Sequence, residues 1–314
     1  MTTATGRRGA VITGWGTALP PKIVTNDDLA TMVDTSDEWI RDRTGIAERR
    51  IGGTTAGLAI EAGAEALARA GVTADQIDLV ILATTTPDDQ VPATASAVQH
   101  GLGLSCGAMD LNAACSGFMY GLVTAHAMIG LGTERILVVG SETLSRIVDW
   151  TDRTTCILFA DGAGAVVLEA CDGPGELLGW NLGSQGEFRH ILFADVGGTL
   201  EMEGKEVFRQ AVKAMAASAN ASMDQAGVTA DDISLVIPHQ ANARIIDASM
   251  NRLGIPTERA VMVLQHTGNT SSATIPLALA DALDNDRIAA GDLVLLVGFG
   301  AGMTSASAVL RWGG

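Results

Sequence analysis

The sequence predicts an α/β protein built from two duplicated halves, because one pattern occurs twice. Residues 71–81 read GVTADQIDLVI, and residues 227–237 read GVTADDISLVI. Each copy follows an Ala-rich segment typical of a helix, residues 60–70 and residues 211–226. Each copy ends in a short β-branched run, which is typical of a buried strand. The repeat therefore predicts a helix, a tight turn and a strand in the same order in both halves.

A second pair of strand-like runs supports the duplication. Residues 136–140 (ILVVG) resemble residues 293–298 (LVLLVG), and neither run alternates between apolar and polar residues. Such continuous apolar runs are typical of strands buried on both faces of a parallel sheet. Runs rich in small residues follow in the same order, at 163–168 and 305–310. We expect a strand at each of these four places.

The boundary between the halves is predicted from a loop signal. Residues 172–175 (DGPG) combine the residue types that interrupt regular structure. We therefore divide the chain into an N-terminal half, residues 1–172, and a C-terminal half, residues 173–314. Because duplicated α/β halves usually bring corresponding loops together at their interface, we expect one site that draws residues from both halves.

Composition limits the functions to be considered. With 47% hydrophobic and 18% charged residues, the chain can bury a large core. A net charge of −16 disfavours general binding to nucleic acid or to an anionic membrane, so an acidic partner needs a local basic patch. Residues 1–9 contain no apolar signal region, and no apolar stretch approaches the ~20 residues that span a bilayer. We expect a cytoplasmic protein, since the four cysteines suggest no disulfide framework.

Cys115 is the candidate nucleophile. It lies between a short strand-like segment, residues 110–112, and an apolar helix-forming run, residues 118–129. A cysteine at a helix N-terminus lies near unpaired N–H groups and the positive end of the helix dipole, so we expect its thiolate to be favoured. The alternative interpretation is a small buried apolar side chain. The other three cysteines lack this context, and we interpret them as structural.

His239 and Asn269 are the candidate partners of this cysteine. His239 directly follows the second copy of the repeated strand, at the sheet edge where open α/β sheets bind ligands. Asn269 lies in a polar, glycine-containing turn before an apolar helix, residues 275–283, and its side-chain amide can donate a hydrogen bond. The alternative interpretations are a histidine satisfied within a loop and an asparagine that forms a turn or a helix cap.

The glycine-rich loop 298–302 (GFGAG) follows a buried strand and can bring a backbone N–H close to a ligand oxygen. It has neither the GxxxxGK[ST] form nor the dinucleotide-binding spacing, so we do not expect it to bind a nucleotide phosphate. The cysteine spacings match no metal-binding motif, and we expect no metal site.

Together, these motifs resemble the β-ketoacyl-acyl-carrier-protein synthase III family, the initiating condensing enzymes of bacterial fatty acid synthesis within the thiolase superfamily. The resemblance extends over nearly the whole chain. It is carried by six segments: VDTSDEWI (33–40), RTGI (43–46), AACSG (113–117), FADGA (159–163), PHQAN (238–242) and GNTS (268–271).

The resemblance implies a duplicated, thiolase-like, five-layered α-β-α-β-α fold and a homodimer. It implies that Cys115 is the acylated nucleophile, that His239 and Asn269 complete the catalytic triad, and that the backbone N–H groups of Cys115 and Ala301 form the oxyanion hole. The implied reaction joins an acyl-coenzyme A primer to malonyl-acyl carrier protein by decarboxylative Claisen condensation. It proceeds through acyl-Cys115, and it needs no cofactor because the coenzyme A thioester is a substrate.

The resemblance also implies which residues bind the substrates. Positions that contact coenzyme A in the family are matched by Trp39, Arg43, Arg153 and Asn242. A basic patch for docking the acidic carrier protein is expected on four residues: Arg209, Lys213, Arg244 and Arg252. The alternative interpretation of these four is ordinary solvated side chains.

Three departures from the family pattern concern the substrates. Residues 186–203, which normally help to wall the active-site tunnel, form a shorter segment than usual. Val91 stands where some members carry Phe at the far end of the acyl pocket, so we expect room for a longer or branched primer. Lys205 occupies a position often held by Asn, which alters one coenzyme A contact.

Two other functions could use the same residues. One is a synthase-III-like condensing enzyme or acyltransferase of secondary metabolism. The other is a cysteine thioesterase, in which water instead of the carbanion attacks the acyl-enzyme. A biosynthetic thiolase requires a second catalytic cysteine in the loop 298–302, which has none. Elongating synthases pair two histidines with the cysteine, whereas here His266 lies three residues before Asn269. Formation of a β-ketoacyl product that depends on malonyl thioester distinguishes the synthase from the thioesterase.

Overall fold

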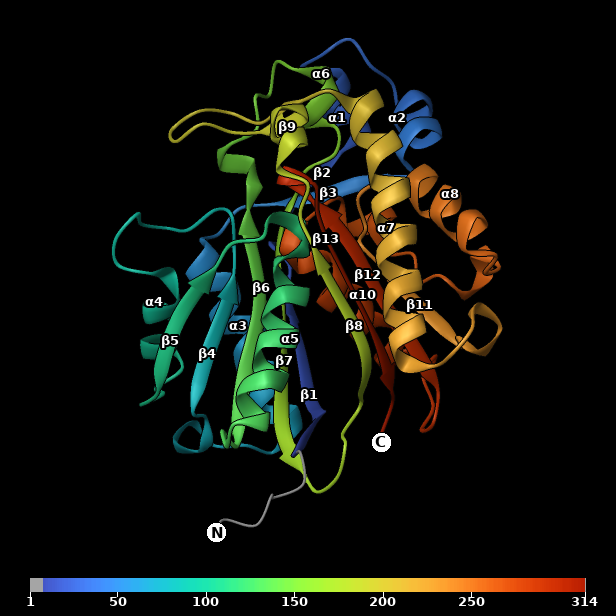
Figure 1. Ribbon diagram of the computed structural model, residues 1–314. Helices are drawn as coiled ribbons and strands as arrows, with labels where there is room; N and C mark the ends of the chain where they lie inside the picture. The colour runs from blue at the N-terminus through green and yellow to red at the C-terminus, as the bar shows by residue number, and fades with distance from the viewer. Residues whose placement is uncertain (1–7, 314) are drawn as a thin grey trace.

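The computed structural model describes residues 8–313, and residues 1–7 of the N-terminal segment considered above lie outside this range. Two sheets form the framework of the molecule (Figure 1). The first sheet has the strand order β1 (Gly9–Ala18), β7 (Asp161–Cys171), β6 (Arg135–Thr143), β4 (Leu79–Ala83) and β5 (Gly107–Leu111). The second has the order β8 (Leu177–Gly183), β13 (Thr304–Arg311), β12 (Leu293–Gly300) and β11 (Leu235–Pro238).

The strand pairing repeats between the two sheets. β4 runs parallel to β6 with Leu79 opposite Ile136, and β11 runs parallel to β12 with Leu235 opposite Val294. In each sheet an antiparallel neighbour follows, β7 beside β6 and β13 beside β12. The four runs expected as strands are therefore β6, β7, β12 and β13, and the duplication read from the sequence extends to the register of the sheets.

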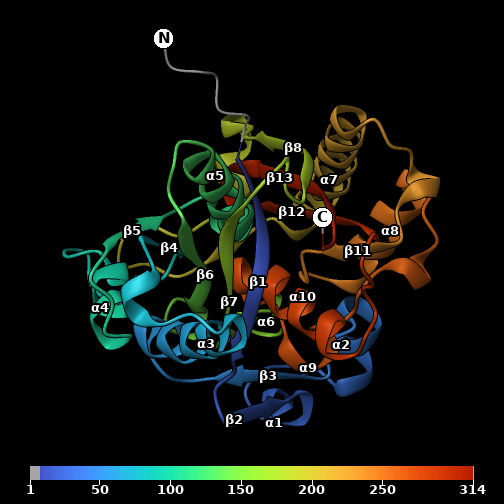
Figure 2. The same ribbon diagram turned by 90° about the horizontal axis from the view of Figure 1, so that it is seen from below.

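Helices form the remaining layers. The outer face of the first sheet is covered by α3 (Thr55–Ala70), with α4 (Thr94–Gly101) beside it. Between the sheets lie α5 (Gly117–Gly130) and α10 (Thr274–Asp284) (Figure 2). The second sheet is covered by α7 (Gly204–Ala226), against which α8 (Ala243–Leu253) packs. This arrangement is the predicted five-layered α-β-α-β-α fold.

Shorter elements gather at the end of the molecule that is uppermost in Figure 1. The elements that remain are α1 (Asn26–Ala30), α2 (Asp37–Thr44), α6 (Arg153–Cys156), α9 (Leu264–Thr267) and the strand pairs β2 (Lys22–Thr25) with β3 (Glu48–Ile51) and β9 (Leu192–Phe193) with β10 (Glu201–Met202). The carboxyl ends of β4, β6, β11 and β12 point toward this end, so that loops from both halves meet there.

The repeated segment has the same local structure in both halves. α3 and α7 each end at a glycine in the left-handed conformation, Gly71 with φ 66° and Gly227 with φ 69°. A short 3-10 turn follows, and in both copies a threonine closes a capping box, Thr73 with Gln76 and Thr229 with Asp232. Glycine ends the helix because it reaches positive φ without a Cβ clash, and the capping box satisfies the exposed N–H groups of the turn.

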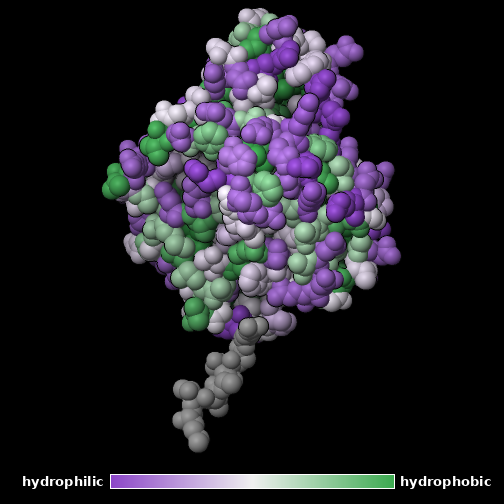
Figure 3. Space-filling model, turned by 45° about the horizontal axis from the view of Figure 1, so that its top comes forward, coloured by the Kyte–Doolittle hydropathy of each residue, from purple (hydrophilic) through white to green (hydrophobic). Residues whose placement is uncertain are grey.

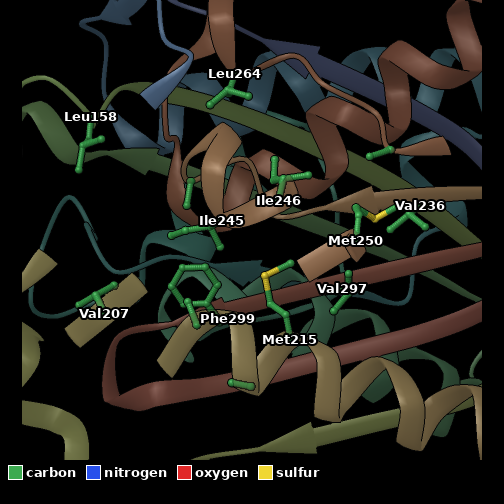
Figure 4. Close-up of a cluster of buried hydrophobic side chains, with 14 of the residues drawn as sticks. Leu158, Val207, Met215, Val236, Ile245, Ile246, Met250, Leu264, Val297 and Phe299 are labelled. Atoms are coloured by element: carbon green, nitrogen blue, oxygen red, sulfur yellow. The ribbon is translucent and has the colours of Figure 1, made fainter. Parts of the chain in front are cut away.

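Small residues allow the layers to approach closely. A Cβ on Gly14 of β1 would lie 2.2 Å from the carbonyl oxygen of Ala66 in α3, and a Cβ on Gly179 of β8 would lie 2.2 Å from that of Ser222 in α7. The duplicated helix–sheet contact therefore requires glycine in both halves. Figure 4 shows part of the apolar cluster between α7, α8 and the second sheet, where Met215, Ile246 and Val297 pack together.

No helix within residues 8–313 is both long enough and apolar enough to cross a membrane.

Candidate active site

A 3-10 turn, Ala114–Ser116, carries Cys115 between β5 and α5. Ala114 adopts a φ of 49°, a strained value for a residue with a Cβ, and its N–H donates to Asn112 Oδ1 at 3.1 Å. The second half of the chain supports the turn from the other side. Thr304 Oγ1 donates to the carbonyl oxygen of Ala113 at 2.9 Å, and a Cβ on Gly300 would lie 2.6 Å from the Cys115 nitrogen.

The Cys115 thiol is protonated in the free protein. Its side chain is buried, and burial raises its pKa to about 12, with a further contribution from the negative charge of Glu142. A hydrogen bond from Ser271 acts in the opposite direction but is the smaller effect. Burial of the sulfur therefore acts against the thiolate that we expect from the position of Cys115 at a helix N-terminus.

His239 follows β11 directly and is 1% exposed. Burial lowers its pKa to about 3, so the imidazole is neutral. Its Nδ1 lies 2.6 Å from Thr274 Oγ1, and its ring packs edge-on against Phe299 with the centroids 5.3 Å apart. These contacts hold the imidazole in one orientation.

Asn269 is held by its backbone and by its side-chain oxygen. Its N–H donates to the carbonyl oxygen of Leu158, and its carbonyl oxygen accepts from the N–H of Ala160, both at 2.9 Å. Its Oδ1 accepts from the N–H of Ser271 at 2.9 Å. This bond identifies Oδ1 as the acceptor of the amide, so the side-chain NH₂ group of this cavity-lining residue is available as a donor.

The three candidate catalytic residues line a single cavity of about 360 Å³. Its apolar wall includes Phe299 and Ile245, both visible in the cluster of Figure 4. Thus the structure brings together one residue of the first half, Cys115, and two residues of the second half, His239 and Asn269.

A second cavity of about 350 Å³ meets the first at Cys115. Ala301, which the sequence predicts for the oxyanion hole, lines this second cavity beside Cys115. Phe159 and Leu192, like Cys115, line both cavities. The site therefore has two compartments, one on each side of the sulfur.

The residues predicted to bind coenzyme A gather at the first cavity. Trp39, Arg43 and Asn242 line it, as does Lys205. Arg153 is absent from the described lining, but its guanidinium carbon lies 4.7 Å from the Trp39 ring centroid, and that of Arg43 lies 4.8 Å away. Asn242 Oδ1 accepts from the N–H of Arg244, and Asn242 Nδ2 donates to the carbonyl oxygen of Arg43.

The predicted docking residues lie on two neighbouring helices beside this cavity. Arg209 and Lys213 are exposed on α7, and Arg244 and Arg252 are exposed on α8. Arg244 also lines an adjoining hollow with Arg43 and Lys205. Arg209 forms a 2.7 Å ion pair with Glu206, which reduces the charge that it can offer to a partner. Hydrophilic side chains cover much of the face shown in Figure 3.

The short segment 186–203 contributes to both cavities. It folds into a 3-10 turn, Gly186–Ile191, and the β9–β10 hairpin. Its Met202 lines the first cavity, and Arg189 lines the second. Val91, by contrast, is 85% exposed and lines neither cavity, so the prediction that it borders the acyl pocket does not hold within one chain. The reason is that Val91 lies in the loop between β4 and α4, where its side chain is open to solvent in the single chain.

Three further residues, which the sequence analysis did not single out, affect the site. Thr274 contacts His239, Ser271 contacts Asn269, and Glu142 acts on the charge state of Cys115. Ser271 lies in the GNTS segment, so its place beside Asn269 offered a signal, whereas Glu142 lies 27 residues from Cys115 in a segment without a motif. No group of three or more His, Cys, Asp and Glu side chains among residues 8–313 is arranged to hold a metal ion.

Five layers, with a cysteine, a histidine and an asparagine around one cavity, define the class of thiolase-like condensing enzymes. Comparison with known families agrees. Models described as 3-oxoacyl-[acyl-carrier-protein (ACP)] synthase III and as its C-terminal part match residues 109–186 and 223–312. The chain belongs to the β-ketoacyl-[acyl-carrier-protein] synthase III family.

Individual relatives cover almost the whole chain. The β-ketoacyl-[acyl-carrier-protein] synthase III of Roseiflexus castenholzii is 50% identical over 323 residues, with 96% of this chain and 98% of that protein covered. The crystal structure of 3-oxoacyl-[acyl-carrier-protein] synthase III from Aquifex aeolicus matches with a TM-score of 0.95 and 44% identity, covering 97% and 100% of the two chains. The priming β-ketosynthase from the R1128 polyketide pathway matches with a TM-score of 0.94 and 35% identity, covering 99% and 98%.

The charge state of Cys115 predicts its reactivity in the free protein. Because the thiol pKa is raised to about 12, alkylation by iodoacetamide should become about tenfold faster with each pH unit between pH 7 and pH 9, without levelling off. Intact-protein mass spectrometry against time measures the rate, and Cys115→Ala corrects for the other cysteines. A plateau below pH 9 contradicts the protonated resting thiol.

Proposed function

We propose that this chain is a β-ketoacyl-acyl-carrier-protein synthase III that condenses an acyl-coenzyme A primer with malonyl-acyl carrier protein and so initiates fatty acid synthesis. The observation that supports it most is the placing of Cys115, His239 and Asn269 around one cavity. We interpret the first cavity as the entrance for both thioesters and the second cavity as the compartment for the acyl chain. Coenzyme A enters as part of a substrate, and the reaction uses no resident cofactor.

In the first half-reaction, Cys115 takes the acyl group from coenzyme A. The sulfur attacks the thioester carbonyl, the carbon–sulfur bond to coenzyme A breaks, and the thiol proton leaves with the coenzyme A thiol. The backbone N–H groups of Cys115 and Ala301 stabilise the oxyanion, each contributing roughly 10²–10³ in rate in comparable sites. The buried, protonated thiol makes this step dependent on substrate binding, which brings the carbonyl to the sulfur.

In the second half-reaction, the malonyl group loses carbon dioxide, and an enolate forms. His239 Nε2–H and the Asn269 NH₂ group donate hydrogen bonds to the enolate oxygen. Because burial keeps His239 neutral, it stabilises this charge without readily protonating the carbanion. The carbanion attacks the acyl-Cys115 carbonyl, the bond to sulfur breaks, and the β-ketoacyl group remains on the carrier protein.

The basic side chains divide into two groups in this proposal. Arg43 and Lys205 lie at the mouth of the first cavity and suit the phosphates of coenzyme A, with Trp39 and Arg153 beside them. Lys213, Arg244 and Arg252 suit an acidic carrier protein, because they are exposed on the two helices next to that mouth. An overall charge of −16 makes this local patch necessary for docking.

The assembly and location follow the family expectation. We retain the homodimer as part of the proposal, since β5 is an edge strand of its sheet and Val91, in the loop between β4 and α4, is 85% exposed. Val91 can border an acyl pocket only if it reaches the site of a second copy. We also retain the division into halves at residues 172 and 173, which falls in the connection between β7 and β8, and a cytoplasmic location.

The covalent step tests the proposal directly. Incubated with acetyl-, isobutyryl- and octanoyl-coenzyme A in turn, the intact protein should gain the mass of one acyl group, and Cys115→Ala should gain none. Added malonyl-acyl carrier protein should then yield β-ketoacyl-acyl carrier protein. Asn269→Ala should still become acylated but lose roughly 10²–10³ in condensation rate. Loss of the acyl mass to water without a condensation product points instead to a thioesterase.

Secondary metabolism is the second candidate setting, and the priming β-ketosynthase at 35% identity favours keeping it. Repeating the condensation with malonyl groups on a fatty-acid carrier protein and on a polyketide carrier protein separates the two, because acceptance only from the polyketide carrier protein indicates the specialised role.

The contact between Thr274 and His239 gives a second prediction. The single hydroxyl hydrogen of Thr274 serves either His239 Nδ1 at 2.6 Å or the Ser271 carbonyl oxygen at 2.9 Å, and donation to Nδ1 places the imidazole hydrogen on Nε2. Thr274→Val should slow malonyl decarboxylation about tenfold, the equivalent of one hydrogen bond of ~1.4 kcal/mol. Thr274→Ser should restore the rate, and equal rates in both variants contradict a role for the hydroxyl.

The docking patch gives a third prediction. Lys213→Glu should lower kcat/KM for malonyl-acyl carrier protein by about tenfold at low ionic strength, and the difference should fade as salt is added. The rate of Cys115 acylation by acyl-coenzyme A should not change, because that substrate needs no carrier protein. Arg311→Glu, the same charge reversal at the end of β13, is the matched control. An equal effect of both variants assigns the change to net charge alone.

A further inference from the structure

A buried carboxylate lies between the two halves of the site. Glu142, near the end of β6, is 0% exposed and forms no ion pair with any side chain of residues 8–313. A buried charge without a counter-ion requires several hydrogen-bond donors. Its donors are the hydroxyls of Thr84, Thr85, Thr86, Ser271 and Ser272 and the backbone N–H of Thr85.

These donors connect the carboxylate to Asn269. Ser271 Oγ and Ser272 Oγ each donate to Glu142 Oε1 at 3.0 Å, and the N–H of Ser271 donates to Asn269 Oδ1 at 2.9 Å. On the other side, Thr86 Oγ1 donates to Oε2 at 2.6 Å. The carboxylate therefore joins the loop after β4, in the first half, to the turn after Asn269, in the second half.

The same carboxylate is one hydrogen bond from the cavity that holds the nucleophile, because Ser271, which donates to it at 3.0 Å, lines the second cavity together with Cys115. Its negative charge adds to burial in raising the pKa of the Cys115 thiol. Of the other groups that line the two cavities, His239 is neutral, and the charged ones, Arg43, Lys205 and Arg189, are cations. Glu142 is thus the anionic group that acts on the sulfur in the described structure.

We propose that Glu142 is a positioning residue for the condensation. It fixes the Ser271–Ser272 turn so that the Asn269 amide faces the enolate oxygen, and it presents a negative charge to the Cys115 sulfur. The inference rests on the proposed function for its first part, since the enolate forms only in that reaction. Its second part concerns the thiol alone and is independent of the substrate.

The two parts predict changes of opposite sign when the charge is removed. In Glu142→Gln, an NH₂ donor replaces one carboxylate oxygen, so the side chain can no longer accept from both the Ser271–Ser272 turn and the Thr84–Thr86 loop. Decarboxylation of malonyl-acyl carrier protein should therefore slow about 10- to 100-fold, as expected when a reacting group is misplaced. The thiol loses a neighbouring negative charge, so its pKa falls, and alkylation of Cys115 by iodoacetamide at pH 8 should become faster. General damage to the fold does not produce this pair of changes together with an unchanged melting temperature.

Two further variants separate position from charge. Glu142→Asp keeps the charge but shortens the side chain, so decarboxylation should slow while alkylation stays near the wild-type rate. Glu176→Gln removes another buried carboxylate, one that accepts from the N–H groups of Ile12 and Gly313 far from the site, and it should change neither rate. If Glu142→Gln does not fold, Ser271→Ala serves instead. Its decarboxylation should be slower, and its alkylation should be slower too, because the Ser271 hydrogen bond lowers the thiol pKa and the loss of that bond raises it.

Each outcome decides the inference. Wild-type rates in Glu142→Gln for both reactions overturn it, and so does a loss of both rates with a lowered melting temperature, which assigns Glu142 a purely structural role. If the wild-type enzyme does not decarboxylate malonyl-acyl carrier protein, the proposed function fails. The alkylation rates of Glu142→Gln and Glu142→Asp still decide whether the carboxylate controls the sulfur.

Discussion

The turn Ser271–Ala273 packs directly against β6, and the site depends on this contact between the two halves. A Cβ on Gly140 of β6 would lie 2.4 Å from the carbonyl oxygen of Ser272, so the approach is possible only beside glycine. Ser272 Oγ also lies 2.9 Å from the carbonyl oxygen of Ala83 at the end of β4, and its single hydrogen serves either this oxygen or Glu142 Oε1. The contact therefore fixes Asn269, one turn away, relative to the strands of the first half.

Burial is the second consequence of this packing, and it decides the charge states of the site. The same loss of water that raises the pKa of Cys115 lowers the pKa of His239, so both groups are neutral in the free protein. A neutral histidine suits the stabilisation of an enolate, since an imidazolium would protonate the carbanion. A neutral thiol, however, must lose its proton during acylation, and substrate binding has to make this loss favourable. Burial thus favours enolate stabilisation in the second half-reaction, while it makes the thiol a weaker nucleophile for acylation in the first.

The two cavities meet at the sulfur because segments from distant parts of the chain close around it. Leu192 of the short segment 186–203 and Phe159 of the first half line both compartments. In the proposed function this arrangement separates the path of the thioester from the space for the acyl chain, with Cys115 in the lining of both cavities. Under that proposal, variation in the 186–203 segment changes cavity walls without changing the segments that hold Cys115, His239 and Asn269.

The sequence by itself determined the duplicated fold, because continuous apolar runs, a glycine stop and a capping threonine act locally and recur in both copies. It also indicated Cys115, His239 and Asn269, since each follows or precedes a regular element at a motif. Only the tertiary structure decided the protonation of Cys115, the exposure of Val91 and the place of Glu142. The physical reason is that desolvation and charge–charge interactions depend on the atoms that surround a group in space. Those atoms come from segments as far apart as residues 84–86 and 271–272, which no local pattern connects.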